Sequence, residues 1–204
     1  MTHIAVTEDD EPTGGFGPAA DAEQRLDGTL VDAEFGYRVA QFYFHEAELL
    51  DEGRYSDWLE VFDDDLHYWL PTRSNRTRRQ QALAVAQPGE AAFYDETKDS
   101  LAWRIRRYDS GMAWSEDPPS RTRHLITNVS VRHKGEPEVA GPREFTARSA
   151  FLVYRSRLER EVDLYAGSRT DVLRLHPDGE LRVAKRTILL ESNVLLAKNI
   201  STFF

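Results

Sequence analysis

The stretch from Glu46 to Arg76 constrains the fold most, because its hydrophobic spacing changes there from a helical to a strand period. Apolar residues leading into it recur every three or four positions, which predicts a long helix; they are Phe35, Val39, Phe42, Tyr43, Leu49 and Leu50. A short second helix is expected around Trp58 and Leu59, ending in an acidic turn at 63–65. Apolar and polar residues then alternate over 66–71, which predicts a strand.

The middle of the chain is expected to hold a long loop and a third helix. Residues 72–92 are polar and contain the break Pro88-Gly89, a combination typical of a loop. A helix is predicted from Asp95 to Tyr108, since its apolar residues share one helical face.

Strand patterns dominate the rest of the chain. Alternating runs lie near 124–131 and 145–154, and two longer runs flank the turn signal 176–179, His-Pro-Asp-Gly. In the first run, one face is expected to hold Leu125, Thr127, Val129 and Val131. Consecutive strands joined by short connections should be antiparallel. A curved, mainly antiparallel sheet around three N-terminal helices makes an α+β domain, which we expect to span residues 35–204.

The preceding residues, 1–34, differ from this domain in charge. They hold nine of the acidic residues and a single basic one, Arg25, so most of the formal net charge of −9 lies there. A glycine-containing, acidic segment with few large apolar residues gains too little from burial to offset its ordering entropy. We expect a flexible leader arm; an arm that docks on a partner is the alternative.

Composition excludes several kinds of site. The chain has no cysteine, so it can form no disulfide, thiolate nucleophile or cysteine-ligated iron–sulfur cluster. No apolar run approaches the roughly 20 residues of a membrane span, and the first residues lack the features of a signal peptide. We therefore expect a cytoplasmic protein that does not bind membranes. No basic stripe interleaved with aromatic residues indicates nucleic-acid binding.

Histidine and carboxylate residues are the candidates for chemistry by the chain itself. His67 and His124 lie near the starts of predicted strands, where they can share a cavity with Asp57 or Tyr68 for acid–base work. However, His67 alternates with the apolar residues of its strand, so its side chain is expected to point away from the core. The spacing of the histidines does not suit a metal-binding triad. We expect no catalytic, cofactor-binding or metal-binding residue in this chain.

The last residues of the sequence stay apolar up to Phe203-Phe204. Such a segment is expected to be buried, either against the chain's own core or against another subunit. The aromatic residues elsewhere permit a hydrophobic ligand site, but an ordinary core with a subunit interface explains them as well.

Four segments carry a resemblance to a known family. They are AELLDEGRYSDWLEVFDDDLHYWLP at 47–71, FYDE at 93–96, SEDPPSRTRHLITNVSV at 115–131 and RTILLESNVLLAKNISTFF at 186–204. In order and spacing they resemble the small, or β, subunit of aromatic-ring-hydroxylating dioxygenases, and most of all the biphenyl, toluene and cumene branch. The same resemblance implies the cone-like fold of the nuclear transport factor 2 and SnoaL type.

The resemblance implies a structural role in an α3β3 assembly with large α subunits. Each α subunit would hold a Rieske [2Fe–2S] cluster and a mononuclear Fe(II), and NAD(P)H would supply electrons through a reductase and a ferredoxin. The holoenzyme would add O2 to aromatic hydrocarbons to give cis-dihydrodiols. Two rival functions stay open at this point: a stand-alone dehydratase or isomerase of the same fold, acting through His67, His124 and Asp57, and a silent ligand-binding module.

Overall fold

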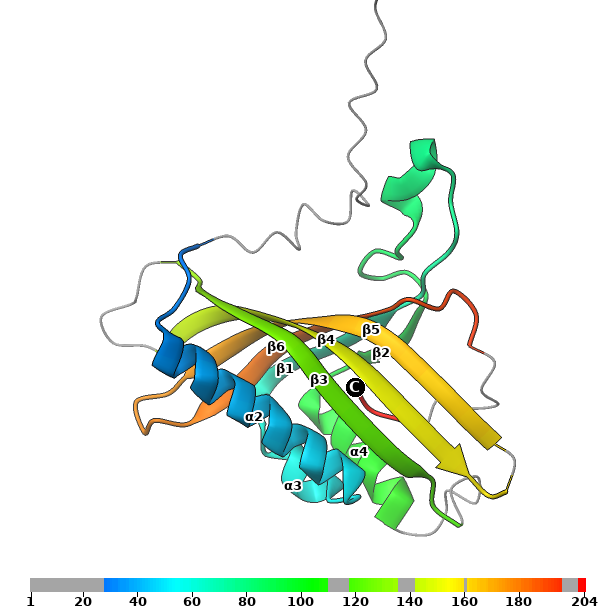
Figure 1. The fold of residues 1–204 in the computed structure, drawn as a ribbon, viewed down its shortest axis with the longest axis horizontal. Coiled ribbons are helices and arrows are strands. Elements are labelled where there is room, and N and C mark those ends of the chain that lie inside the picture. Colours follow the sequence, from blue (N-terminus) through cyan, green and yellow to red (C-terminus); the bar gives the residue numbers. More distant parts are fainter. Residues whose placement is uncertain (1–27, 110–117, 136–141, 160, 196–201) are drawn as a thin grey trace, which may run out of the picture.

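A computed structural model describes residues 28–109, 118–135, 142–159, 161–195 and 202–204 (Figure 1). Its elements are, in chain order, α2 (Ala33–Asp51), α3 (Tyr55–Leu59), β1 (Phe62–Pro71), the 3-10 helix η1 (Arg78–Leu83), β2 (Ala92–Glu96), α4 (Lys98–Asp109), β3 (Arg121–His133), β4 (Arg143–Arg157), β5 (Glu161–Leu175) and β6 (Leu181–Leu190).

The strands form one six-stranded sheet in the order β2-β1-β6-β5-β4-β3. Every neighbouring pair is antiparallel except β1 and β6, which run parallel. The sheet curves strongly, and α2, α3 and α4 lie on its concave side (Figure 1). The predicted α+β cone with a mainly antiparallel sheet is therefore confirmed. At the β5–β6 hairpin, Gly179 adopts a φ of 88° and its N–H donates to the His176 carbonyl, as the turn sequence predicts.

Helix α2 supplies one wall of the core. Asp32 caps its N-terminus by accepting a hydrogen bond from the Phe35 N–H at 2.8 Å. The predicted apolar face packs inward, and it buries Val39, Tyr43, Glu46, Ala47, Leu49 and Leu50. One member of that face, Glu46, is charged and fully buried, so the helix brings an ion as well as apolar surface into the core.

The acidic run 63–65 is not the turn that its composition predicts, because it lies inside β1. Helix α3 ends earlier, and Phe62 already pairs with Val183 of β6. Arg174 of β5 contacts Asp63 and Asp65, at 3.3 and 2.6 Å respectively. Counter-charges from a distant strand thus allow an acidic sequence to lie in the sheet.

The segment before α4 also differs from expectation. The residues between 72 and 92 contain η1, and Arg73 forms an isolated bridge with Val85. The next residues form the edge strand β2, in which Tyr94 pairs with Leu70, so the third helix begins at Lys98 rather than Asp95. A strand of five residues has too short an alternation to be separated from a helix start by sequence pattern.

Strand β3 contains a bulge, and the parity of the residues that face the core changes across it. The register shifts between Thr127 and Ser130, where Asn128 adopts a φ of 54°. Leu125 therefore faces solvent while Val131 is buried, so the predicted single face that contains both is wrong.

Residues 28–31 pack against this same strand. The Val31 N–H bonds to the Val131 carbonyl, and Leu30 forms a bridge with Arg132. Residues 1–27, and with them most of the expected flexible leader, lie outside the described residues. The boundary between a leader at 1–34 and a domain at 35–204 stays a prediction.

Candidate functional site

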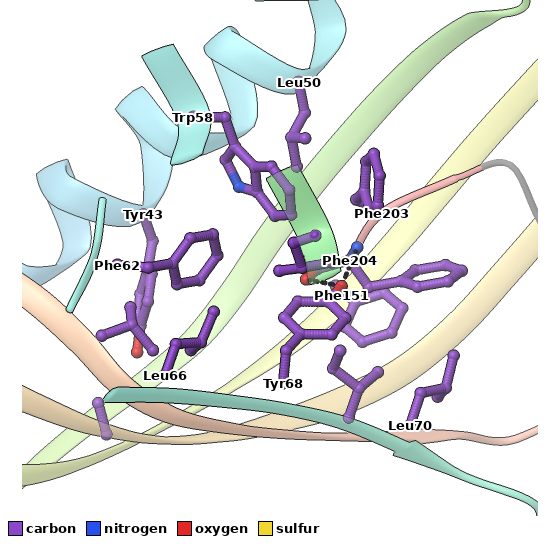
Figure 2. Packing of buried hydrophobic residues seen from close by; sticks show 14 of the residues in the cluster. Tyr43, Leu50, Trp58, Phe62, Leu66, Tyr68, Leu70, Phe151, Phe203 and Phe204 are labelled. Atoms are coloured by element: carbon purple, nitrogen blue, oxygen red, sulfur yellow. Dashed lines mark hydrogen bonds between the residues drawn. The ribbon is translucent and has the colours of Figure 1, made fainter. Parts of the chain in front are cut away.

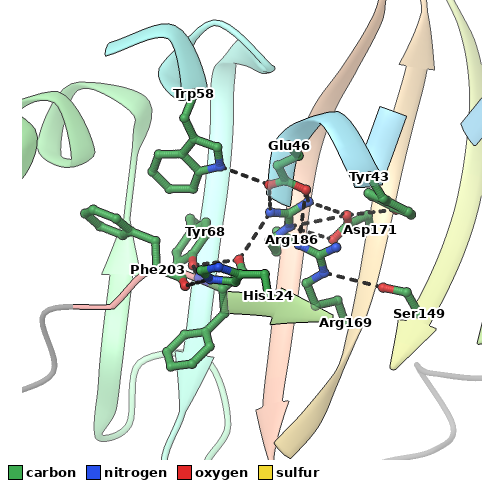
Figure 3. Close-up of polar contacts among 11 residues, drawn as sticks. Tyr43, Glu46, Trp58, Tyr68, His124, Ser149, Arg169, Asp171, Arg186 and Phe203 are labelled. Carbon is green, nitrogen blue, oxygen red and sulfur yellow. Dashed lines mark hydrogen bonds and ion pairs between the residues drawn. The ribbon is translucent and has the colours of Figure 1, made fainter. Parts of the chain in front are cut away.

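A buried network of charged side chains lies at the centre of the concave face (Figure 3). Glu46 of α2 accepts hydrogen bonds from Arg186 of β6 and from Arg169 of β5, at 3.0 and 3.1 Å respectively. The indole Nε1 of Trp58 also donates to Glu46, at 3.0 Å. The network therefore joins both helices α2 and α3 to the middle of the sheet.

The second carboxylate of the network is Asp171 of β5. Arg186 donates to it from Nη2 at 2.8 Å and from Nε at 3.1 Å, and the Tyr43 hydroxyl donates to it at 2.9 Å. Two guanidinium groups, of Arg169 and Arg186, thus face two carboxylates, those of Glu46 and Asp171. The two positive and two negative charges balance, so these four side chains can be buried. An unpaired buried charge would be costly.

The surroundings fix the protonation of these groups. Burial raises the pKa of Glu46, but the charges of Arg186 and Arg169 outweigh it and lower the pKa from 4.5 to about 2. Burial and the charge of Asp171 raise the pKa of Tyr43 well above its ordinary value. Glu46 stays ionised and Tyr43 stays protonated near neutral pH, so neither is poised to exchange protons with a substrate.

The last described residues occupy the concavity beside this network (Figure 2). Phe203 and Phe204 are 2% and 1% exposed, and both belong to the hydrophobic core. The Phe203 ring stacks on Trp58, with ring centroids 4.7 Å apart. The Phe204 ring contacts Phe151 and Tyr165 on the sheet. Of the two expectations for this segment, burial against the chain's own core is confirmed.

Polar side chains also hold this segment (Figure 3). The Tyr68 hydroxyl accepts from the Phe204 N–H at 2.8 Å and donates to the Phe204 oxygen at 2.9 Å. His124 Nε2 lies 3.0 Å from the Phe203 carbonyl oxygen, and Arg186 Nη1 donates to the Phe204 oxygen at 3.2 Å. Through Arg186, the segment and the charged network form one connected unit.

Of the residues considered for acid–base catalysis, Tyr68 and His124 both contact the segment at 202–204. His67, His124 and Asp57 do not come together. His124 is buried and pairs with Asp51, whereas half-exposed His67 pairs with Asp95 at 2.8 Å. Asp57 is exposed and bonds to Arg54. The predicted outward orientation of His67 is confirmed, because the residues on either side of it in β1 are buried and it is not. Each of the three residues has its own partner, so the arrangement required by the dehydratase or isomerase alternative is missing from the described residues.

The sequence interpretation missed the charged network itself. Its signal was the position of charged residues on buried faces: Glu46 lies on the apolar stripe of α2, and Arg169 and Asp171 share the inward parity of β5. Within the described ranges, no group of three or more histidine, aspartate or glutamate residues is arranged to hold a metal ion. No helix in this part of the chain is long and apolar enough to cross a membrane.

Comparison with known sequences gives consistent matches. The family model described as "Ring hydroxylating beta subunit" matches residues 45–197. The chain is 39% identical over 175 residues to the biphenyl 2,3-dioxygenase subunit beta of Rhodococcus jostii strain RHA1, a match covering 85% of this chain and 91% of that protein. It is 38% identical over 178 residues to the benzene 1,2-dioxygenase subunit beta of Pseudomonas putida, with the same coverage.

Solved structures share the fold at lower sequence identity. A chain of naphthalene 1,2-dioxygenase with indole bound in its active site superposes with a TM-score of 0.78 at 23% identity, covering 91% of this chain and 94% of that one. ActVI-ORFA of Streptomyces coelicolor superposes with a TM-score of 0.53 at 16% identity, covering 80% and 99%. These likenesses agree with the cone-like architecture of the sheet and helices.

Proposed function

This chain belongs to the β subunits of ring-hydroxylating dioxygenases, and on that premise we propose that three copies of it hold three large α subunits in an α3β3 assembly. The holoenzyme is an oxidoreductase, and this chain is its non-catalytic subunit. Each α subunit would carry a Rieske [2Fe–2S] cluster and a mononuclear Fe(II). Electrons from NAD(P)H would reach them through a reductase and a ferredoxin, and aromatic hydrocarbons would leave as cis-dihydrodiols. Because NAD(P)H is the proposed electron source, we place the assembly in the cytoplasm.

The observation that carries the structural role is the occupied interior of the cone. Acid–base catalysis needs a side chain that reaches the substrate. Here Phe203 and Phe204 are buried in the core on the concave side of the sheet, and the charged side chains beside them bond to one another. We propose accordingly that the chain supplies no catalytic, cofactor-binding or metal-binding residue.

An exposed apolar patch supports association with other subunits. It lies on the convex face of the sheet, at one end of β3, β4 and β5, and consists of Leu125, Leu152, Tyr154, Val162 and Leu164. Leu125 pairs with Leu152 across the β3–β4 ladder, and Tyr154 pairs with Leu164 across β4–β5, so these side chains form a continuous surface. Continuous exposed apolar surface of this kind marks interaction sites.

The proposal is tested by co-expressing this chain with its large subunit and measuring iron in the purified material. We expect iron and a red-brown colour in the complex, and none in this chain when the large subunit is omitted. Iron bound by this chain alone, or failure of the two chains to copurify, would overturn the proposal.

A further inference from the structure

The segment Thr202–Phe204 is held by side-chain hydrogen bonds to its backbone, as a bound peptide is. Its carbonyl groups face side chains of four different strands: Tyr94 of β2 at Thr202, His124 of β3 at Phe203, and Tyr68 of β1 together with Arg186 of β6 at Phe204. Most backbone groups in proteins bond to other backbone groups. Among the described contacts of this segment, the hydrogen bonds come instead from side chains.

The two aromatic rings occupy separate subsites. The Phe203 ring lies among Trp58, Tyr55 and Tyr94, which come from α3 and β2. The Phe204 ring lies against Phe151 of β4 and Tyr165 of β5. Figure 2 shows the two rings pointing to different parts of the core. Two successive aromatic side chains are therefore held in separate subsites, one formed by α3 and β2 and the other by β4 and β5.

The residues that recognise the segment are held by contacts outside it. Arg186 is fixed by Glu46 and Asp171, and His124 is fixed by Asp51, whose carboxylate lies 2.6 Å from its Nδ1. Groups held in place before a ligand arrives lose little freedom when it binds. The donors would therefore stay in place when the segment leaves.

We propose that the interior of the cone is a peptide-binding site for two successive aromatic residues, and that Thr202–Phe204 occupies it as an intramolecular ligand. The site goes beyond the structural role in the assembly and does not depend on it. When empty, it accepts the same peptide from solution. Arg186 faces the Phe204 oxygen, so a peptide that ends there in a free carboxylate binds more tightly than its amide.

The test removes residues 202–204 from this chain, co-expressed with its large subunit, and adds the peptide acetyl-Ile-Ser-Thr-Phe-Phe. Calorimetry is expected to show 1:1 binding to the shortened chain, with at least tenfold weaker binding when both phenylalanines of the peptide are alanine. The full-length chain is expected to bind neither peptide, because its own segment competes at an effective concentration in the millimolar range. Binding of equal strength to the full-length chain, or no binding to the shortened one, would overturn the proposal.

If the shortened chain does not fold alone, the peptide is added during refolding. A ligand that binds only the folded state stabilises it, so the near-ultraviolet circular dichroism of the full-length chain should return. Failure of the peptide to restore it contradicts the proposal and identifies the segment as ordinary core.

A matched pair of variants of the shortened chain tests the polar contacts. Tyr68→Phe removes the hydroxyl that bonds both backbone groups of Phe204, and we expect peptide binding about tenfold weaker. Tyr154→Phe, on the convex face, should leave binding unchanged. Equal effects of the two substitutions would contradict the assignment.

Discussion

His124 and Asp51 form a buried pair that joins strand β3 to the end of helix α2, with Nδ1 and Oδ1 2.6 Å apart. The backbone N–H of His124 donates to the same carboxylate at 3.1 Å. On its other side, the ring reaches the Phe203 carbonyl oxygen. Both ring nitrogens of His124 therefore lie within hydrogen-bond distance of an oxygen. The pair thus links α2, the sheet and the last residues.

Replacing His124 with alanine is expected to destabilise the chain by about 2 kcal/mol, because it removes the ring that contacts both the buried Asp51 carboxylate and the Phe203 carbonyl oxygen. The carboxylate keeps its contacts with Arg123 and with the backbone N–H of residue 124. Urea unfolding of the purified chain measures the loss. His67→Ala is the control, since its pair with Asp95 is partly exposed and exposed pairs contribute less than about 1 kcal/mol. Equal losses in the two variants would contradict a structural role for His124.

Shortening Phe204 to alanine is expected to cost about 3–5 kcal/mol, the range for a large aromatic side chain in a packed core. Thermal unfolding tests this, with Val194→Ala as the control because its side chain is exposed.

Deleting 195–204 should weaken assembly, because the core beneath the convex patch loses the side chains of Phe203 and Phe204. Recovery of a normal complex from the deletion variant would contradict this expectation.

The lowered pKa of Glu46 predicts acid sensitivity. A carboxyl group whose pKa is about 2 in the folded chain and 4.5 in the unfolded chain contributes stability above pH 4.5, and this contribution is lost as the pH falls toward 2. The contribution is about 3 kcal/mol at neutral pH. Glu46→Gln should therefore flatten the fall in stability between pH 5 and 2, measured by urea unfolding at each pH. Glu48→Gln, on the exposed side of the same helix, should keep the steeper wild-type dependence.

Arg186 is expected to be the most sensitive position of the charged network. Arg186→Met leaves Glu46 and Asp171 without their shared partner in a fully buried site, at a cost of about 3–5 kcal/mol. Circular dichroism during thermal unfolding measures it. Arg182→Met, at a partly exposed position of the same strand, is the control, and a similar loss there would contradict the special role of Arg186.

The convex patch predicts a different result. Leu164→Arg places a charge in the exposed surface and should reduce assembly. The free energy of unfolding of the isolated chain should stay within about 0.5 kcal/mol of the wild-type value. Analytical ultracentrifugation reports the assembly. The same substitution at Leu83, an exposed residue of η1, should have no effect on it. Loss of assembly in both variants would contradict the choice of surface.

The parts of the fold that follow from local periodicity were predictable from the sequence. The apolar stripe of α2, the long strands and the turn at Gly179 have signals within a few residues of each other. The burial of Phe203 was predictable from the apolar residues around it in the sequence. The residues that it contacts in the core were not predictable. Trp58, which stacks on it, is far away in the sequence.

The partners in features that depend on distant counter-charges could not be predicted, although the position of Glu46 on an apolar helix face indicated that it is buried. Asp63 lies in a strand because Arg174 and His176 contact it, and Glu46 is buried because Arg169 and Arg186 reach it from strands more than 100 residues away. An acidic residue taken alone indicates a turn or a solvated surface. Only the assembled sheet brings the charges together.

Native mass spectrometry of the complex purified with the large subunit tests the central claim most directly. The account predicts three copies of each chain in one particle, and a trimer of this chain after mild dissociation of the large subunits. A complex with unequal numbers of the two chains, or large subunits that form the same particle without this chain, would contradict it.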